Sequence, residues 1–224
     1  PIANMDVFCF ADKTLADRVG LPDRILHPSR VLEGVHLGVE DGGNKSGIPT
    51  INGSIHFDDS YAGKPLVYVG TIGALPPSTE HYPQTHLKNQ KAGDYIVVAG
   101  GRVGSDGIHG ATFSSLALDE NAPATAVQIG DPFTQKKLSD FLLEARNQGL
   151  YSSLTDNGAG GISSSVGEMA ELTGGARIQL EKVPLKYAGL ASFEIMISES
   201  QERMSFSVAP QKLESFLELA KNFE

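Results

Sequence analysis

The sequence predicts a mixed α/β fold in which helices and strands pack in layers. Three observations support this fold class: helix-like and strand-like apolar patterns alternate along the chain, each expected helix has one apolar face, and the composition is that of an ordinary globular protein. Hydrophobic residues make up 40% of the 224 residues and charged residues 20%, a balance that excludes a disordered chain. A chain of this length forms one large domain or two small ones.

The first part of the chain predicts strands and one clear helix. The helix is expected at residues 28–41, with Gly42 and Gly43 as its C-terminal stop. Three apolar or β-rich segments are expected to be strands: residues 2–10, 48–57 and 66–72. The polar segment 76–91, which contains three prolines, is typical of a linker. We therefore expect two domains, 1–85 and 86–224.

The second part of the chain continues the alternation. Asp131 and Pro132 are expected to begin a helix that runs to Gln148, and Pro210 a last amphipathic helix with Leu213, Phe216, Leu217 and Ala220 inward. A further helix is expected at residues 162–172. Five segments are expected to be strands: residues 95–99, 150–155, 176–183, 194–198 and 204–208.

Charge and cysteine content narrow the classes of function. The net charge is −9 and the isoelectric point is near 5.1, which argues against a nucleic-acid-binding surface. The single cysteine, Cys9, lies in an apolar stretch and is expected to be a core thiol, so a reducing, cytoplasmic location is the natural expectation. No apolar run approaches the ~20 residues of a membrane span. The chain starts without Met or a basic leader, which suggests an excised or processed segment.

A glycine-rich loop follows the strand expected at 95–99. Residues 100–110 would expose successive backbone N–H groups, which suit phosphate oxygens. The loop has no Walker A pattern, because Gly-Lys-Ser/Thr is absent. A tight turn is an equally good explanation of the glycines. The phosphate-binding candidates in this loop are Gly104, Asp106, Gly107 and His109.

Two further segments place polar side chains at the edges of expected elements. Gln128 offers an amide donor and acceptor just before a helix, while Asp131 is expected only to cap that helix. Asp156 comes at the end of an apolar strand, immediately before glycines, where a hard carboxylate oxygen suits Mg²⁺. An Asx turn that merely stabilises the loop is the competing explanation for Asp156, and local sequence favours it.

Residues 198–204 form a dense polar run between two apolar segments. The run Ser-Glu-Ser-Gln-Glu-Arg-Met contains no Gly, Asn or Asp, so an ordinary hairpin turn explains it poorly. Hydroxyl groups beside an arginine suit a phosphate or carboxylate ligand. Ser200, Gln201 and Glu202 are therefore candidate substrate-binding residues.

Taken in order, these segments resemble one family, phosphoribosylformylglycinamidine synthase. The resemblance rests on five segments: residues 47–50, 101–109, 127–132, 156–161 and, above all, 197–204. It covers essentially the whole chain and implies an aminoimidazole ribonucleotide synthetase-like fold, with part of the N-terminal domain and most of the C-terminal α/β domain. Ser105 departs from the family pattern, in which many members have a basic residue before Asp-Gly-Ile.

The resemblance implies an ATP-dependent ligase of purine biosynthesis. Formylglycinamide ribonucleotide would be phosphorylated by ATP on its amide oxygen, and ammonia from a separate glutaminase would displace phosphate. By position, Gln128, Ser200, Gln201 and Glu202 would bind the ribonucleotide, and Asp156 would bind Mg²⁺. The family's catalytic His and main ATP-binding residues lie upstream of the matched stretch. The chain alone, without the remaining synthetase segments, is therefore expected to be inactive and to self-associate.

Two other interpretations stay open. The chain could belong to another ATP-dependent enzyme of the superfamily, although residues 198–204 disfavour it. It could also be a non-catalytic half that holds a structural nucleotide. Solvent exposure of Gln128 and Asp156 in a cleft would favour the active half, and burial of both would favour the structural one.

Overall fold

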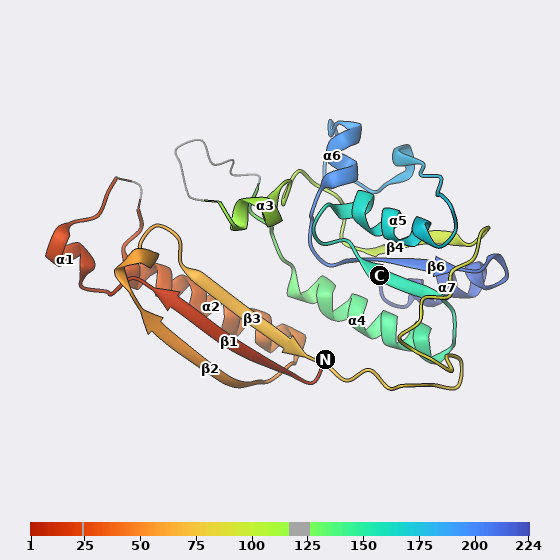
Figure 1. The fold of residues 1–224 in the computed structure, drawn as a ribbon, viewed down its shortest axis with the longest axis horizontal. Coiled ribbons are helices and arrows are strands. Elements are labelled where there is room, and N and C mark those ends of the chain that lie inside the picture. Colours follow the sequence, from red (N-terminus) through yellow and green to blue (C-terminus); the bar gives the residue numbers. More distant parts are fainter. Residues whose placement is uncertain (24, 117–125) are drawn as a thin grey trace. The chain divides into compact units, whose positions relative to one another are not determined.

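The structure, a computed structural model, describes residues 1–23, 25–116 and 126–224. It divides into two compact units, Pro1–Ala74 and Leu75–Glu224, each with its own three-stranded sheet (Figure 1). The sequence placed the boundary at residue 85. Part of the expected linker is attached to the second unit, because the Tyr82 hydroxyl donates to the carbonyl of Tyr151 (2.6 Å) and the Gln90 amide to that of Met169 (3.2 Å).

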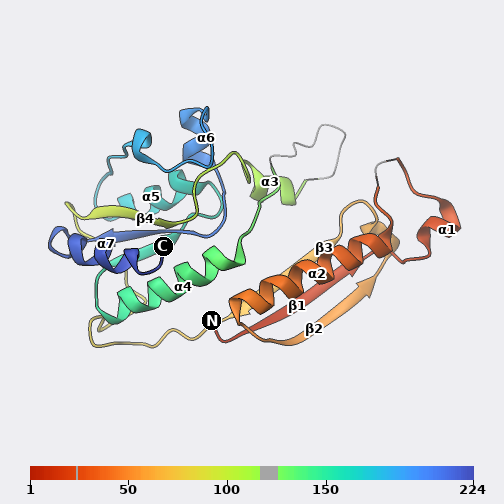
Figure 2. The same cartoon turned by 180° about the vertical axis from the view of Figure 1, so that it is seen from behind.

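The sheet of the first unit is centred on β1 (Ala3–Phe10). This strand pairs in parallel with β2 (Thr50–Phe57) and antiparallel with β3 (Leu66–Ile72). The long helix α2 (Pro28–Ser46) runs along this sheet, and the short α1 (Leu15–Val19) follows β1 (Figure 2). Cys9 is buried, which confirms the prediction of a core thiol.

Helix α2 is longer than predicted. The expected stop at Gly42 and Gly43 is wrong, because the helix continues through both glycines to Ser46. The first residue with left-handed backbone is Gly47 (φ 70°), and its N–H donates to the carbonyl of Gly43 as a C-terminal cap. Glycine inside a helix is tolerated at about 1 kcal/mol each relative to Ala.

The sheet of the second unit has the order β4-β6-β5. Both β4 (Tyr95–Gly100) and β5 (Ser153–Asp156) run antiparallel to the central strand β6 (Arg203–Val208). The carboxyl ends of β4 and β5 therefore lie at the same end of the sheet as the start of β6. The predicted mixed α/β fold is confirmed, and its topology gathers three polar segments at that end.

Helices cover both faces of this sheet (Figures 1 and 2). On one face, α4 (Pro132–Asn147) and α7 (Leu213–Lys221) pack with β6 around Phe141, Phe206 and Phe216. The apolar stripe of α4 expected from its sequence, Leu138, Phe141, Leu142 and Ala145, packs in this cluster. Leu217 of α7 is 45% exposed, so its expected inward position is wrong.

The other face is covered by α5 (Gly161–Glu171) and α6 (Ser192–Ile197). A second apolar cluster forms there around Val103, Ile162 and Ile195. Strand β6 presents Phe206 and Val208 to the first face. Its alternate residues are buried and polar, namely Arg203, Ser205 and Ser207. The remaining α-helix, α3 (Gly110–Ser114), follows the glycine-rich loop.

Two predicted strands are wrong. Residues 194–198 belong to helix α6, whose start is capped when the Glu194 carboxylate accepts from the backbone N–H of Ala191 (2.7 Å). Short apolar runs do not distinguish helix from strand, which explains the error. Residues 176–183 contain only the 3₁₀ turn Leu180–Lys182. Just beyond this segment, a single isolated parallel β-bridge joins Leu185 to Val103.

Within the part of the chain that the structure describes, no helix is long and apolar enough to cross a membrane.

Candidate functional site

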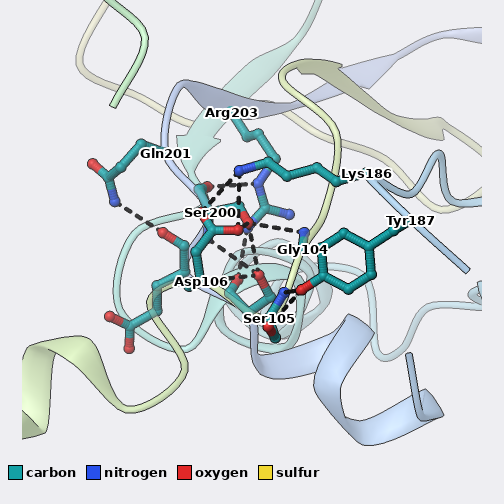
Figure 3. A network of polar contacts seen from close by, with 10 residues as sticks. Gly104, Ser105, Asp106, Lys186, Tyr187, Ser200, Gln201 and Arg203 are labelled. Carbon is teal, nitrogen blue, oxygen red and sulfur yellow. Dashed lines mark hydrogen bonds and ion pairs between the residues drawn. The ribbon is translucent and has the colours of Figure 1, made fainter. Parts of the chain in front are cut away.

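Four polar segments of the second unit meet where β4 and β5 end and β6 begins. They are the loop after β4, the segment before α4, the loop after β5 and residues 198–203. Figure 3 shows part of this arrangement, in which Asp106 of the glycine-rich loop and Ser200 lie at the centre of a polar network. Because the sheet is antiparallel about β6, segments far apart in sequence become neighbours here.

Residues 198–203 are held by their own arginine. Arg203 Nε donates to the carbonyl of Ser200 (2.7 Å), and Nη2 donates to that of Ser198 (2.6 Å). Both serines are fully buried, and burial lowers the pKa of Arg203 while the charge of Asp106 raises it. A guanidinium is the side chain suited to such a fork, because its donors are fixed in one plane. The run is thus a loop closed by side-chain-to-backbone hydrogen bonds rather than an ordinary hairpin turn.

The glycine-rich loop is fastened to this segment through Asp106. The buried carboxylate of Asp106 receives Lys186 Nζ at 2.9 Å on both oxygens and Ser200 Oγ at 2.8 Å. Ser200 Oγ also accepts from the N–H of Gly104 (3.0 Å). Two of the phosphate-binding candidates therefore have partners inside the protein. Phosphate contact by this loop stays a prediction.

The other two candidates in the loop have left-handed backbone. Gly107 has φ 77° and His109, at the start of α3, has φ 59°. A side chain at Gly107 would lie 2.8 Å from Cβ of Glu199, so only glycine fits. His109 is one of two non-glycine residues with positive φ in the described chain, and the other is Glu202 (φ 55°). Such backbone is uncommon and tends to persist at functional sites.

Glu199 connects residues 198–203 to the other polar segments. It was not among the site residues predicted from the sequence. Its side chain is 4% exposed. Oε2 accepts from the N–H of Ala111 (2.9 Å) and from the amide of Gln128 (3.0 Å), and Oε1 accepts from the N–H of Gly160 (3.2 Å). The sequence feature that could have identified Glu199 is its position between two serines in the polar run. A buried, charged acceptor of this kind orients every donor around it.

Gln128 and Asp156 are both exposed. Gln128 donates its amide N–H to Glu199, so this bond does not use its amide oxygen. Asp156 Oδ1 accepts from the N–H of Gly158 (2.9 Å), so the Asx turn considered from the sequence is present. Asp131 caps α4 as predicted, because its Oδ1 accepts from the N–H of Phe133 (3.0 Å).

Gln201 and Glu202 complete the set predicted from the sequence. The Gln201 amide donates to the carbonyl of Glu199 (2.9 Å), and both side chains are half-buried. Burial raises the pKa of Glu202, the neighbouring charges of Asp131 and Asp106 raise it further, and a backbone hydrogen bond from Asp131 lowers it. A carboxyl whose pKa is shifted by burial is a common feature of ligand sites, although it also occurs in structural networks.

A cavity in the second unit lies elsewhere. It has a volume of about 780 Å³ and is lined by β4, α5 and residues 175–184. None of the nine residues predicted as site residues lines it. Among the described residues no group of three His, Cys, Asp or Glu side chains is placed to hold a metal ion. The polar convergence around Glu199 and Ser200 is therefore the candidate site.

Comparison with known proteins matches the two units to two domain families. Residues 1–75 match the AIR synthase related protein N-terminal domain, and residues 91–224 match the C-terminal domain. The phosphoribosylformylglycinamidine synthase subunit PurL of Pyrococcus abyssi is 42% identical over 226 residues, covering 98% of this chain and 31% of the relative. That of Salinibacter ruber is 37% identical over 220 residues, covering 96% and 29%. The chain thus spans about 30% of the length of these relatives.

Solved structures agree with this assignment. Thermotoga maritima PurL complexed with FGAR has a TM-score of 0.78 and 33% identity, covering 100% of this chain and 34% of that chain. Escherichia coli HypE, at 20% identity and TM-score 0.64, covers 99% and 63% and shares the fold alone. Because both domain models match, in order and over nearly all residues, the chain belongs to the AIR synthase related protein family.

Proposed function

We propose that this chain is part of a phosphoribosylformylglycinamidine synthase, a cytoplasmic ATP-dependent ligase. The whole enzyme would convert formylglycinamide ribonucleotide to formylglycinamidine ribonucleotide. ATP phosphorylates the amide oxygen of the substrate and leaves as ADP. Ammonia, released with glutamate from glutamine and water by a glutaminase domain or subunit, then adds to the activated carbon as phosphate departs.

One observation carries this proposal. Residues predicted to bind the ribonucleotide converge around Glu199 in a unit whose fold matches PurL complexed with FGAR. Glu199 holds the Gln128 amide through its N–H, and the amide oxygen is left for the ribonucleotide. Gln128, Gln201 and Glu202 then line the ribonucleotide site. The predicted contact of Ser200 with the ribonucleotide is replaced by a supporting role, because Ser200 is fully buried and its hydroxyl bonds to Asp106 and Gly104. Phosphoryl transfer depends mainly on positioning and on stabilisation of charge, which a rigid donor array supplies.

Mg²⁺ fits the residues present. In phosphoryl-transfer sites Mg²⁺ keeps several waters and takes one or two carboxylates together with substrate phosphates, so an isolated exposed carboxylate is sufficient as the protein ligand. Asp156 is such a group, and only its Oδ1 is used in the Asx turn. When bound, Mg²⁺ supplies charge neutralisation at the phosphoryl oxygens. Similar Thermotoga maritima proteins have been solved with ATP and ADP.

Gln128 and Asp156 are both exposed, so the burial of both side chains that the structural-nucleotide interpretation requires is not met. Exposure of both in a solvent cleft, the condition for a catalytic half, stays a prediction, and the catalytic half is the one we propose. The remaining synthetase segments would supply the catalytic His and the main ATP-binding residues. No residue of this chain is therefore assigned as catalytic, and the chain alone is expected to be inactive.

The test uses the full-length polypeptide with formylglycinamide ribonucleotide, ATP, Mg²⁺ and ammonium chloride, which bypasses the glutaminase. We expect ADP release coupled to formation of the amidine. Asp156→Asn should lower turnover by at least ~100-fold, because a metal ligand is lost while the acceptor for the Gly158 N–H is kept. Asp140→Asn on α4, which removes only a half-exposed ion pair with Lys136, is the matched control and should retain activity.

Absence of amidine formation by the wild-type polypeptide would refute the proposed reaction. Near-normal turnover of Asp156→Asn at saturating Mg²⁺ would refute only the metal assignment.

A further inference from the structure

We propose that Lys186 is a positioning residue for the ribonucleotide site, acting through Asp106 and Ser200. It lies outside every segment that the sequence pointed to. This inference rests on the proposed function and names a residue that sets the geometry of the same site. Tyr187, the next residue, assists by holding the neighbouring position of the glycine-rich loop (Figure 3).

The contacts form one continuous chain. Lys186 Nζ binds both carboxylate oxygens of Asp106 at 2.9 Å. Asp106 Oδ1 accepts from Ser200 Oγ (2.8 Å), and Ser200 Oγ accepts from the Gly104 N–H (3.0 Å). Ser200 is adjacent to Glu199, the carboxylate that orients the Gln128 amide. The Lys186 ammonium group is thus linked by hydrogen bonds to the segment that carries Glu199.

A cation is required at this position because Asp106 is only 8% exposed. A carboxylate that has lost most of its water needs an opposite charge beside it, and Lys186 Nζ supplies that charge. The Lys186 side chain is 36% exposed, so it approaches from the solvent side and can be replaced without leaving a buried hole.

Backbone contacts hold this segment independently of the lysine side chain. The Lys186 N–H donates to the carbonyl of Val103 (2.8 Å), and the Val103 N–H donates to that of Pro184 (3.0 Å). The Tyr187 hydroxyl accepts from the Ser105 N–H (2.8 Å) and also bonds the Ser105 hydroxyl. Replacing the ammonium group is therefore expected to loosen Asp106 and Ser200 while the loop stays attached.

The experiment compares three variants of the full-length polypeptide with wild type, using ammonia as nitrogen donor. They are Lys186→Met, Lys186→Arg and the control Lys182→Met, which removes an exposed lysine four residues away. The readouts are KM for formylglycinamide ribonucleotide, KM for ATP, the Kd of the ribonucleotide by calorimetry, and the melting temperature. The binding measurement does not depend on turnover.

We expect Lys186→Met to raise the KM and Kd of the ribonucleotide at least about tenfold, the effect of losing one charge-assisted hydrogen bond in the network. The KM for ATP should change little. Lys186→Arg should restore binding, because a guanidinium can pair with both oxygens of Asp106. Tyr187→Phe, which removes a single oxygen, should weaken ribonucleotide binding in the same direction and to a smaller extent.

Three outcomes would overturn the inference. Wild-type ribonucleotide binding by Lys186→Met would show that the lysine does not position the site. Equal losses for ATP and ribonucleotide together with a lower melting temperature, or failure of Lys186→Arg to rescue, would show a general structural role. A wild-type polypeptide that neither binds the ribonucleotide nor forms amidine would instead refute the proposed function itself, and the inference with it.

Discussion

Single glycines decide whether the polar segments can meet. Gly161, at the start of α5, has φ 56°, and a Cβ there would fall on the carbonyl oxygen of Ser198. Gly100 has φ 111°, and a Cβ there would fall on the carbonyl oxygen of Glu202. Both positions combine a backbone that favours glycine with a close approach of the segment that carries the candidate substrate-binding residues. The packing of this segment therefore tolerates no side chain on either side.

Gly161→Ala is predicted to destabilise the second unit by about 2–4 kcal/mol, because left-handed strain and overpacking add together. Gly167→Ala in the same helix is the matched control. A Cβ at Gly167 meets nothing within 4 Å, so this change should stabilise by about 0.5–1 kcal/mol. Urea denaturation measures both free energies of unfolding. Similar free energies for the two variants would contradict the close approach.

The pH dependence of stability should reveal the burial of Glu202. Its folded-state pKa is raised above the ordinary 4.5, so the folded state holds the proton more tightly than the unfolded state does. The tighter proton binding by Glu202 therefore contributes to the free energy of unfolding below pH 4.5. This contribution is lost as the pH rises through the folded-state pKa of Glu202. Glu202→Gln removes this dependence. The melting temperature of Glu202→Gln should therefore rise relative to that of wild type as the pH increases from 4.5 to 7. If the difference between the two melting temperatures stays constant across this range, burial is not the cause.

At the scale of elements, the sequence correctly predicted those helices and strands that have a capping residue or a long periodic pattern of apolar residues. Asp131 and Pro132 begin α4 as expected, and β6 alternates between an apolar and a polar face. The segment 176–183 has the alternation of a strand, yet it has no ladder in the structure. Whether such a segment forms a strand depends on whether the unpaired edge of another strand lies within reach. Here that edge belongs to β4, on the other side of the 780 Å³ cavity.

We predict that residues 177–182 close onto β4 as a fourth strand in part of the population. Continuing the parallel bridge between Val103 and Leu185 would set Ile178 beside Ile96 and Leu180 beside Val98. Ile96 and Leu180 already pack against the same apolar cluster, which favours this register. Hydrogen exchange should then show slowed amides across 177–182. Ile178→Asp should abolish the slowing, and Gln179→Asp, on the opposite face, should preserve it. Free exchange in wild type would exclude closure.

At the scale of the whole chain, the two units differ in how completely they bury apolar surface. The second unit has two apolar clusters that cover both faces of its sheet. In the first unit β2 is exposed along its entire length and β3 along most of it. Exposed apolar side chains on these strands include Ile55, Phe57, Tyr68 and Val69. An apolar patch of this kind on a sheet favours association with another protein surface.

The isolated 224-residue chain is therefore predicted to form a dimer or larger species through the first unit. Light scattering at increasing concentration measures the mass. Replacing Ile55 and Phe57 by Lys should return the chain to monomer, because charged residues on an edge strand oppose pairing. Replacing the equally exposed Leu172 of the second unit by Lys is the control and should leave association unchanged. A monomeric wild-type chain would contradict the prediction.

The sequence by itself determined most helices, the strands β1 to β6, and the four polar segments of the candidate site. Periodicity, caps and turn residues act over a few neighbouring residues, so they can be read locally. Only the tertiary structure decided that Glu199 joins Gln128 to Gly160, and that Lys186 pairs with Asp106. These partners are between 39 and 80 residues apart. The antiparallel placement of β4 and β5 about β6 brings Gly160 to Glu199, and the parallel bridge between Val103 and Leu185 brings Lys186 to Asp106. No local pattern encodes either arrangement.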